Sequence, residues 1–324
     1  MIGCYHYIIH DFKILSNLYQ KTLIFYPNPL EGILYLWYTE GGGETMKKEQ
    51  ITLEEFYQIK LIHLKGTVPL SFWEDAPHSH DHCEIFIHIK GTLDIFVEKN
   101  LYHLNGNEIR LYRSGELHCG RADTEQDMEW YQISIPHRFF LEAAYAPLAP
   151  ILFDREAGCD NVFATSRQEE LLEALTEVFD AYANHTPLFS LYGQSAVLRL
   201  LCLLNEPCRN RTVTEHQDQV LQQIIDRINT DFQSILGLGD LCRITHYSPS
   251  YLHRLFRSKL NVTPYQFLLG KKLNEAKKSL WQGDTVTEAC DHAGFNNYNN
   301  FITLFKKTFG ITPNKYREQY RLRS

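Results

Sequence analysis

An internal repeat near the C-terminal end constrains the fold of this 324-residue chain more than any other feature. The segment YLHRLFRSKLNVTPYQF (251–267) aligns with NFITLFKKTFGITPNKY (300–316) at an offset of 49 residues. LGDLCRITHYS aligns with VTEACDHAGFN upstream at an offset of 48. The alignment pairs Leu252 with Phe301, Leu255 with Leu304, Phe256 with Phe305, Pro264 with Pro313 and Phe267 with Tyr316. It predicts two copies of a unit made of a helix, a short turn and a second helix.

The second helix of each copy has one apolar face and one outward face. The apolar stripe, which we expect to be buried, contains Tyr251, Leu252, Leu255, Phe256 and Leu260 in the first copy, and Phe301, Leu304, Phe305 and Phe309 in the second. The outward positions are Ser250, His253, Arg254 and Arg257 in the first copy, and Asn299, Ile302, Thr303 and Lys306 in the second. Such side chains can read base edges in a DNA groove, because arginine pairs with guanine and asparagine with adenine. The cations best placed for phosphates are Arg257, Lys259, Lys306 and Lys307.

The charge of the chain divides at the same place. The net charge is −7, but residues 218–324 contain 15 Lys+Arg and 9 Asp+Glu, whereas residues 1–217 contain 17 and 30. A basic C-terminal third joined to an acidic remainder indicates that the C-terminal part contacts a polyanion.

This region resembles the C-terminal DNA-binding domain of the AraC family of bacterial transcription regulators. The resemblance covers about residues 218–320, and its most specific part is GFNNYNNFITLFKKTFGITPNKYR, residues 294–317. It implies two helix-turn-helix units joined by a long helix, here about Pro264 to Trp281, with two recognition helices in adjacent major grooves. The family often has arginine where this chain has Thr303. We therefore expect Arg254 and His253 to provide most of the sequence specificity.

The first two-thirds of the chain has a different pattern. Short alternating segments from about residue 59 to 136 predict β-strands of a small sandwich or barrel. Residues 166–204 predict two amphipathic helices that support dimerisation, the first with a capping box formed by Ser166 and Glu169. We expect a sensor domain over 46–204, a linker over 205–217 and the DNA-binding domain over 218–324. Residues 1–45, which end in TEGGGETMKK, are interpreted as an N-terminal extension, and the natural start could instead be Met46.

A cluster of histidines lies in the sensor part, in PHSHDHCEIFIHIKG, residues 77–91. The spacing HxHx3Ex6G, followed downstream by SGELH ending at His118, resembles the two cupin motifs. His78, His80 and Glu84 have the same parity on an extended segment and so share a face. With His118 they would make a ligand set for Fe, Mn, Ni or Zn. The form HSHDHCEI, however, resembles the cupin-like sensor domains of AraC-type regulators, in which such residues remain without a metal.

We therefore predict an α+β multidomain protein: a cupin-like β-barrel with flanking helices, followed by an all-α domain of two helix-turn-helix units. The predicted function is a transcription regulator, an activator by family tendency, that binds double-stranded DNA under the control of a small-molecule effector such as a sugar. The expected effector residues are His78, His80, Glu84, His118 and Trp73, with His82 and His88 the weaker candidates and no metal or other cofactor. We expect a homodimer that contacts RNA polymerase.

Other features of the sequence support a cytoplasmic protein and leave two alternatives. No stretch of about eighteen apolar residues could span a membrane. Eight scattered cysteines without a CxxC pair favour a reducing cytoplasm. The first alternative is a metal-dependent cupin enzyme with a helical appendage. The second is a constitutive regulator with a vestigial pocket.

Overall fold

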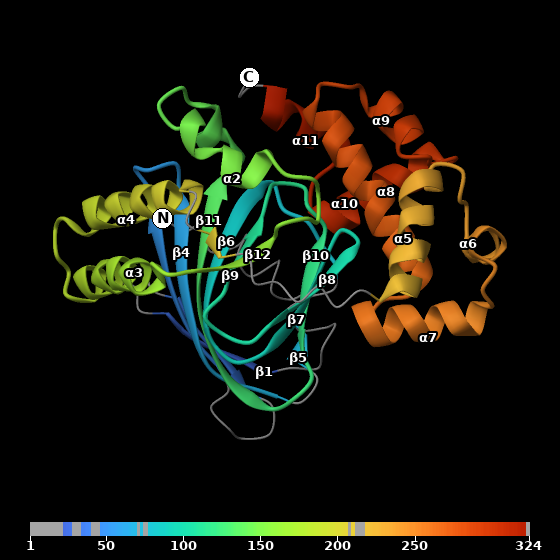
Figure 1. Ribbon diagram of the computed structural model, residues 1–324. Coiled ribbons are helices and arrows are strands. Elements are labelled where there is room, and N and C mark those ends of the chain that lie inside the picture. The colour runs from blue at the N-terminus through green and yellow to red at the C-terminus, as the bar shows by residue number, and fades with distance from the viewer. Residues whose placement is uncertain are drawn as a thin grey trace.

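The structure is a computed structural model, and it has a sheet-rich N-terminal part and a helical C-terminal part (Figure 1). The residues that it describes are 22–27, 34–39, 46–69, 72–73, 77–206, 209–210 and 218–321. Most of the expected extension, residues 1–45, and most of the expected linker, residues 205–217, lie outside this description. Of the extension, the structure describes the strands β1 (Thr22–Pro27) and β2 (Leu34–Thr39), which pair antiparallel.

Two facing sheets form the sensor domain. The larger has the order β13-β12-β9-β6-β11-β4-β3 and the smaller β5-β10-β7-β8. The strand bounds are β3 Met46–Leu53, β4 Ile59–Val68, β5 Phe72–Trp73, β6 His82–Lys90, β7 Leu93–Val97, β8 Asn100–Leu104, β9 Ile109–Tyr112, β10 His118–Ala122, β11 Gln126–Pro136, β12 Val162–Thr165 and β13 Arg209–Asn210. Apolar residues of both sheets, including Ile95 and Trp130, share one buried cluster. The predicted fold class is confirmed, although the described strands do not join into one closed barrel.

The two predicted amphipathic helices cover the outer face of the larger sheet (Figure 1). They are α3 (Gln168–Ala183) and α4 (Phe189–Asn205), and a large apolar core fills the space between them and the sheet. Three short helices, η1 (His137–Leu141), η2 (Ala146–Leu148) and α2 (Pro150–Phe153), connect β11 to β12. The predicted capping box is wrong, because α3 begins at Gln168 after Arg167 and no side chain caps it.

The C-terminal part confirms the repeat. Its helices are α5 Gln219–Asp231, α6 Leu238–Thr245, α7 Pro249–Leu260, α8 Pro264–Trp281, α9 Val286–His292, α10 Tyr298–Phe309 and α11 Pro313–Arg321. The two helix-turn-helix units are α6–α7 and α9–α10, and α8 connects them. Asn261 and Gly310 occupy equivalent positions and both end their helices in the left-handed conformation, with φ of 54° and 75°. This shared signal explains why both recognition helices stop at the same point.

The two domains share a hydrophobic core rather than only touching through a linker. Phe96, Leu117 and Cys119 of the sensor domain are buried in one cluster with Leu221 of α5 and Phe267 of α8. The ring centroids of Phe96 and Phe267 are 5.9 Å apart, in an edge-to-face arrangement. Side chains from both domains therefore complete the core beneath the first recognition helix. Among the described residues, no helix is both long and apolar enough for a membrane span.

Candidate functional site

The outward faces of α7 and α10 form the candidate DNA-binding surface. Seven of the nine predicted residues are exposed and two are half-buried. The exposed residues are Ser250, Arg254, Arg257, Asn299, Thr303, Lys306 and Lys307, and the half-buried ones are His253 and Ile302. On the inner faces Leu252, Phe256, Leu260, Phe301 and Phe305 are buried as predicted, whereas Tyr251, Leu255, Leu304 and Phe309 are half-buried. The structure thus presents the predicted residues to solvent, and their contact with DNA stays a prediction.

Hydrogen bonds and one ring contact distinguish three of the predicted residues. The Thr303 hydroxyl donates to the carbonyl oxygen of Asn299 at 2.9 Å, so it is engaged within its own helix. The Arg257 guanidinium donates to the carbonyl oxygen of Asn261 at 3.0 Å. The Arg254 guanidinium carbon lies 5.6 Å from the ring centroid of Tyr251, which braces it beside an aromatic face. Arg257 is thus bonded to the end of its own helix, whereas Arg254 lies beside an aromatic ring, and its contact with a base stays a prediction.

The histidine cluster forms where an extended segment before β6 meets the start of β10. The backbone N–H of His78 donates to the carbonyl oxygen of His118 at 3.0 Å, and the His118 N–H donates to that of His78 at 2.9 Å. The N–H of Gly115 donates to the carbonyl oxygen of His80 at 2.8 Å. These pairings bring together two motifs whose paired residues His78 and His118 are 40 residues apart in the sequence. These contacts bring His78, His80 and His118 together, and the role of these residues in effector binding stays a prediction.

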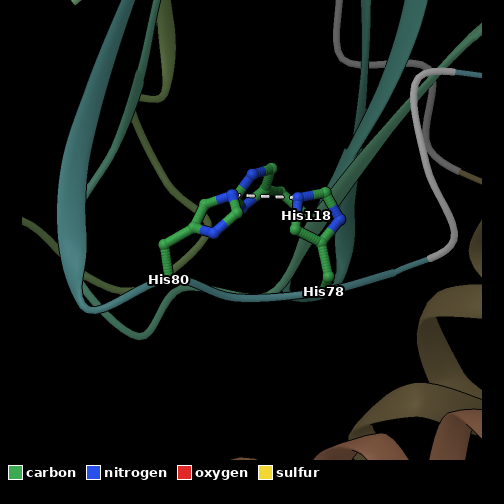
Figure 2. Close-up of side chains that lie close together, drawn as sticks. All are labelled: His78, His80 and His118. Carbon is green, nitrogen blue, oxygen red and sulfur yellow. Dashed lines mark hydrogen bonds between the residues drawn. The ribbon is translucent and has the colours of Figure 1, made fainter. Parts of the chain in front are cut away.

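The imidazole rings of His78, His80 and His118 converge on one point (Figure 2). The Nε2 atoms of His78 and His80 are 3.0 Å apart. Glu84 Oε2 lies 3.5 Å from Nε2 of His80 and 3.4 Å from Nε2 of His118. His82, which the sequence made a weaker candidate, also belongs to the cluster, because its Nε2 lies 3.3 Å from Glu84 Oε1.

Hydrogen bonding fixes the orientation of His118. Its Nδ1 lies 2.9 Å from the carbonyl oxygen of Glu116, and a carbonyl oxygen only accepts, so Nδ1 carries a hydrogen. Nε2 then either carries a second proton and pairs with Glu84 or directs a lone pair toward a cation shared with Glu84. Burial raises the pKa of the Glu84 carboxyl, but hydrogen bonds from His118 and His82 outweigh it and hold that pKa well below its usual range. Burial also lowers the pKa of His80 to about 3, which keeps His80 neutral at neutral pH.

The same distances fit a divalent cation. Ligand atoms at about 2.0–2.1 Å from a tetrahedral ion are about 3.3 Å from one another, close to the separations of 3.0 to 3.5 Å in the cluster. The Nδ1 contact of His118 is the kind of outer hydrogen bond that orients a metal-binding imidazole. The expectation that the cluster works without a metal therefore stays a prediction, and the residues present could hold one.

A cavity of about 980 Å³ lies beside the cluster, at the end of the sensor domain that faces the C-terminal helices. Its wall from the larger sheet includes Lys48, Gln50, Lys60, His82, Glu84 and Gln132, and its wall from the C-terminal domain includes Leu280, Trp281 and Arg317. Of the four expected effector residues whose side chains the structure describes, Glu84 lines this cavity, whereas His78, His80 and His118 do not. Trp73 pairs through its backbone with Arg121 in β5–β10, and its side chain lies outside the description.

The cluster segment also contacts the linker helix α8. The Ser79 hydroxyl donates to Asn274 Oδ1 at 2.7 Å, and Asn274 Nδ2 donates to the carbonyl oxygen of Gly115 at 2.9 Å. The Lys277 ammonium lies 2.9 Å from Asp81 Oδ1, which also accepts from the Tyr316 hydroxyl at 2.9 Å. Asn274 and Lys277 are only 2% and 4% exposed. We call these contacts the interdomain latch, formed by Ser79, Asp81, Asn274, Lys277 and Tyr316.

Glu116, the acid of the SGELH segment, has a structural role. It makes a two-pronged ion pair with Arg155, at 2.6 Å and 2.9 Å. It also accepts from the backbone N–H of Gly158 at 2.8 Å and of Arg113 at 3.0 Å. Burial raises the pKa of the Glu116 carboxyl, but the hydrogen bond and charge of Arg155 lower this pKa by a larger amount. The pKa is therefore below its usual value. Arg155 could not be predicted as the partner of Glu116, because it lies 39 residues away and no motif contains it.

Two family models match the chain. Residues 72–201 match an AraC-like ligand binding domain, and residues 241–319 match a helix-turn-helix domain. The HTH-type transcriptional activator RhaS of Yersinia pestis is 28% identical over 266 residues, which cover 80% of this chain and 94% of RhaS. The HTH-type transcriptional regulator YtdP of Bacillus subtilis is 33% identical over 103 residues, or 32% of this chain, which spans only 13% of YtdP.

Two solved structures match different shares of this chain. The AraC-like transcriptional activator CuxR matches with 13% identity and a TM-score of 0.37, over 80% of this chain and 96% of CuxR. The DNA-binding domain of AdpA, solved in complex with a target DNA, matches with 23% identity and a TM-score of 0.31, over 33% of this chain and 96% of that domain. The paired helix-turn-helix units and the ligand-binding match in the sheet-rich part, taken with the family models, show that this chain belongs to the AraC family of transcription regulators.

Proposed function

We propose that this protein regulates transcription by binding promoter DNA through α7 and α10, under the control of a small molecule bound in the cavity of the sensor domain. The observation that carries the proposal is the interdomain latch, because residues of one short segment contact both the cavity side and the DNA-binding side. Asp81 lines the cavity and pairs with Lys277 of α8. A change at the cavity is thereby transmitted to the helix that connects the two recognition helices.

The proposal has three finer parts: the direction of regulation, the oligomeric state and the class of effector. RhaS, a relative over most of its length, is named an activator, which favours activation and a contact with RNA polymerase. The exposed Leu188, Leu191 and Tyr192, at the start of α4, favour a homodimer through that end of the helical pair. A sugar is one effector class that fits a cavity with several hydroxyl-binding side chains. Promoter binding would place the protein in the cytoplasm.

Arg254→Ala tests the DNA-binding role. Loss of a base-reading arginine should weaken binding to the specific site by about 1–3 kcal/mol and relax discrimination at one position. Binding of the full chain to DNA from upstream of the neighbouring genes and to random DNA would be measured by fluorescence anisotropy. Lys307→Ala is the matched control, because a lysine that contacts phosphate should weaken both DNAs equally and reduce the salt dependence. Unchanged discrimination in Arg254→Ala would contradict the assignment.

A double-mutant cycle tests the latch. Asp81→Asn and Lys277→Met should show a coupling of about 1–2 kcal/mol in the free energy of unfolding, because Lys277 is buried although Asp81 is partly exposed. The control cycle uses Lys90 and Asp127, which have the same separation of 2.9 Å but lie on the surface. Solvent screens that pair, and we expect little coupling there. Equal coupling in both cycles would show that the latch does not tie the domains together.

The convergence of three histidines and Glu84 favours one alternative, a metal-dependent cupin enzyme. Metal analysis of the purified full chain separates the two functions. Stoichiometric metal that is lost in the His78→Ala/His80→Ala variant, together with unchanged DNA binding, would establish a metal centre within a regulator. Stoichiometric metal without any DNA binding would favour the enzyme.

A further inference from the structure

Two lysines on the same wall of the sensor cavity have no carboxylate partner among the described residues. Lys48 is on β3 and Lys60 is on β4, and both line the cavity. In the register Thr52 pairs with Lys60 and Lys48 pairs with Leu64, so the two ammonium groups project from the same face of the sheet. Among the described residues, neither lysine forms an ion pair. Burial lowers the pKa of Lys48, and the charge of Lys60 lowers it further.

Two further residues of the cavity wall, from other elements, have a buried nitrogen atom without a partner. Arg317 Nε of α11 and His137 Nδ1 of η1 are buried nitrogen atoms without a hydrogen-bond partner in the described residues. Both residues line the same cavity. Buried polar atoms normally have a partner, so their presence at a cavity wall points to a ligand there.

The acidic groups of the cavity are already engaged or lie at its edge. Asp81 is paired with Lys277 and Tyr316. Glu84 lies within hydrogen-bonding distance of His82 and accepts from Gln132 at 2.7 Å. Glu54 is exposed. Among the described residues that line the cavity, Lys48 and Lys60 have no ion-pair partner, and Lys60, like Glu54, is exposed, so the unpaired charge is positive on balance.

We propose that the cavity binds a small organic anion that carries hydroxyl groups, such as a sugar acid. The ammonium groups of Lys48 and Lys60 hold its carboxylate, Gln50 and Ser134 contact its hydroxyls, and Arg317 reaches it from the DNA-binding domain. This inference rests on the proposed function and narrows its effector from sugars in general to acidic ones. Because Arg317 belongs to α11, the ligand contacts both domains at once.

Thermal unfolding of the full chain tests the ligand class. The probes are glucose, gluconate, glucuronate, glucose 6-phosphate and hexanoate, each at the same millimolar concentration and ionic strength. We expect gluconate or glucuronate to raise Tm by about 2–4 °C or more, and glucose and hexanoate to leave it unchanged. A rise with glucose 6-phosphate alone would assign the anion as a phosphate. A rise with glucose alone, or with none of the probes, would overturn the proposal.

Two variants separate a binding role from a structural one. Lys48→Gln should abolish the ligand-induced rise in Tm. Lys47→Gln is the control and should preserve that rise, because Lys47 is on the same strand but has its side chain on the other face, where it pairs with Glu49. Without any ligand, Lys60→Gln should raise Tm, because it removes the repulsion between two unpartnered cations. A lower Tm for ligand-free Lys60→Gln would show that this lysine has a structural partner and would contradict the proposal. Specific DNA binding would be measured separately. If the protein binds its DNA site but no acidic sugar raises Tm, this inference fails while the proposed DNA-binding function stands.

Discussion

Replacement of Glu116 by alanine is expected to lower the free energy of unfolding by about 3–5 kcal/mol. The carboxyl is 1% exposed, and its removal leaves the Arg155 guanidinium buried without its counter-charge. It also removes the acceptor for two backbone N–H groups, those of Arg113 and Gly158. Because most domains are stable by only about 5–15 kcal/mol, much of the variant should be unfolded at moderate urea concentrations. Urea titration followed by circular dichroism measures the loss.

The control for Glu116→Ala removes both charges. Glu116→Ala with Arg155→Met should be less destabilised than Glu116→Ala alone, because no buried charge is left unpaired. If the double variant loses as much free energy of unfolding as the two single variants together, the two groups act independently. The ion pair would then not explain the burial of Glu116.

Phe267→Ala is expected to cost about 3–5 kcal/mol and to weaken DNA binding as well. Phe267 is 3% exposed, and its ring lies 5.4 Å from that of Phe256 on the recognition helix α7 and 5.9 Å from that of Phe96 in the sensor domain. Truncation leaves a cavity beneath α7, so the helix loses its fixed position. Thermal unfolding and anisotropy with specific DNA measure the two effects.

Tyr265→Ala is the matched control for Phe267→Ala. Tyr265 is on the first turn of the same helix but is 44% exposed, so its truncation should change stability by no more than about 0.5 kcal/mol. Phe96→Ala should also weaken DNA binding, although Phe96 lies far from the recognition surface in the sequence. Normal DNA binding by Phe96→Ala would contradict the conclusion that the domains share a core.

The helical third was predictable because its signals are local. The linker helix was expected from Pro264 to Trp281 and has those bounds, since Thr263 forms a capping box with Gln266 and proline follows at the first helical position. The repeat then fixed the second unit by comparison with the first. The cap expected at Ser166 failed, because a capping pattern shows only that the hydrogen bond could form.

The cavity was less predictable because it depends on which sheet face the helices cover. On β3 the apolar Ile51 and Leu53 face α3 and α4, so the polar Lys48 and Gln50 face the cavity instead of open solvent. Alternation in the sequence shows two faces but not what lies over each. His82 was placed among the weaker candidates for the same reason, because parity does not show how close a side chain is to the cavity. The latch could not be predicted, since it joins residues that are 195 and 235 apart in the sequence.

The residues of the latch alternate with those of the histidine cluster along one extended segment. His78 and His80 point into the cluster, whereas Ser79 and Asp81 reach α8 and α11. The histidine cluster and the interdomain latch are therefore interleaved residue by residue along one segment, so a shift of its backbone would move both. Under the proposed function, any redesign of this segment would have to include its partners on α8, Asn274 and Lys277. A sensor domain grafted onto an unrelated DNA-binding domain would lose its output unless the α8 surface is transferred with it.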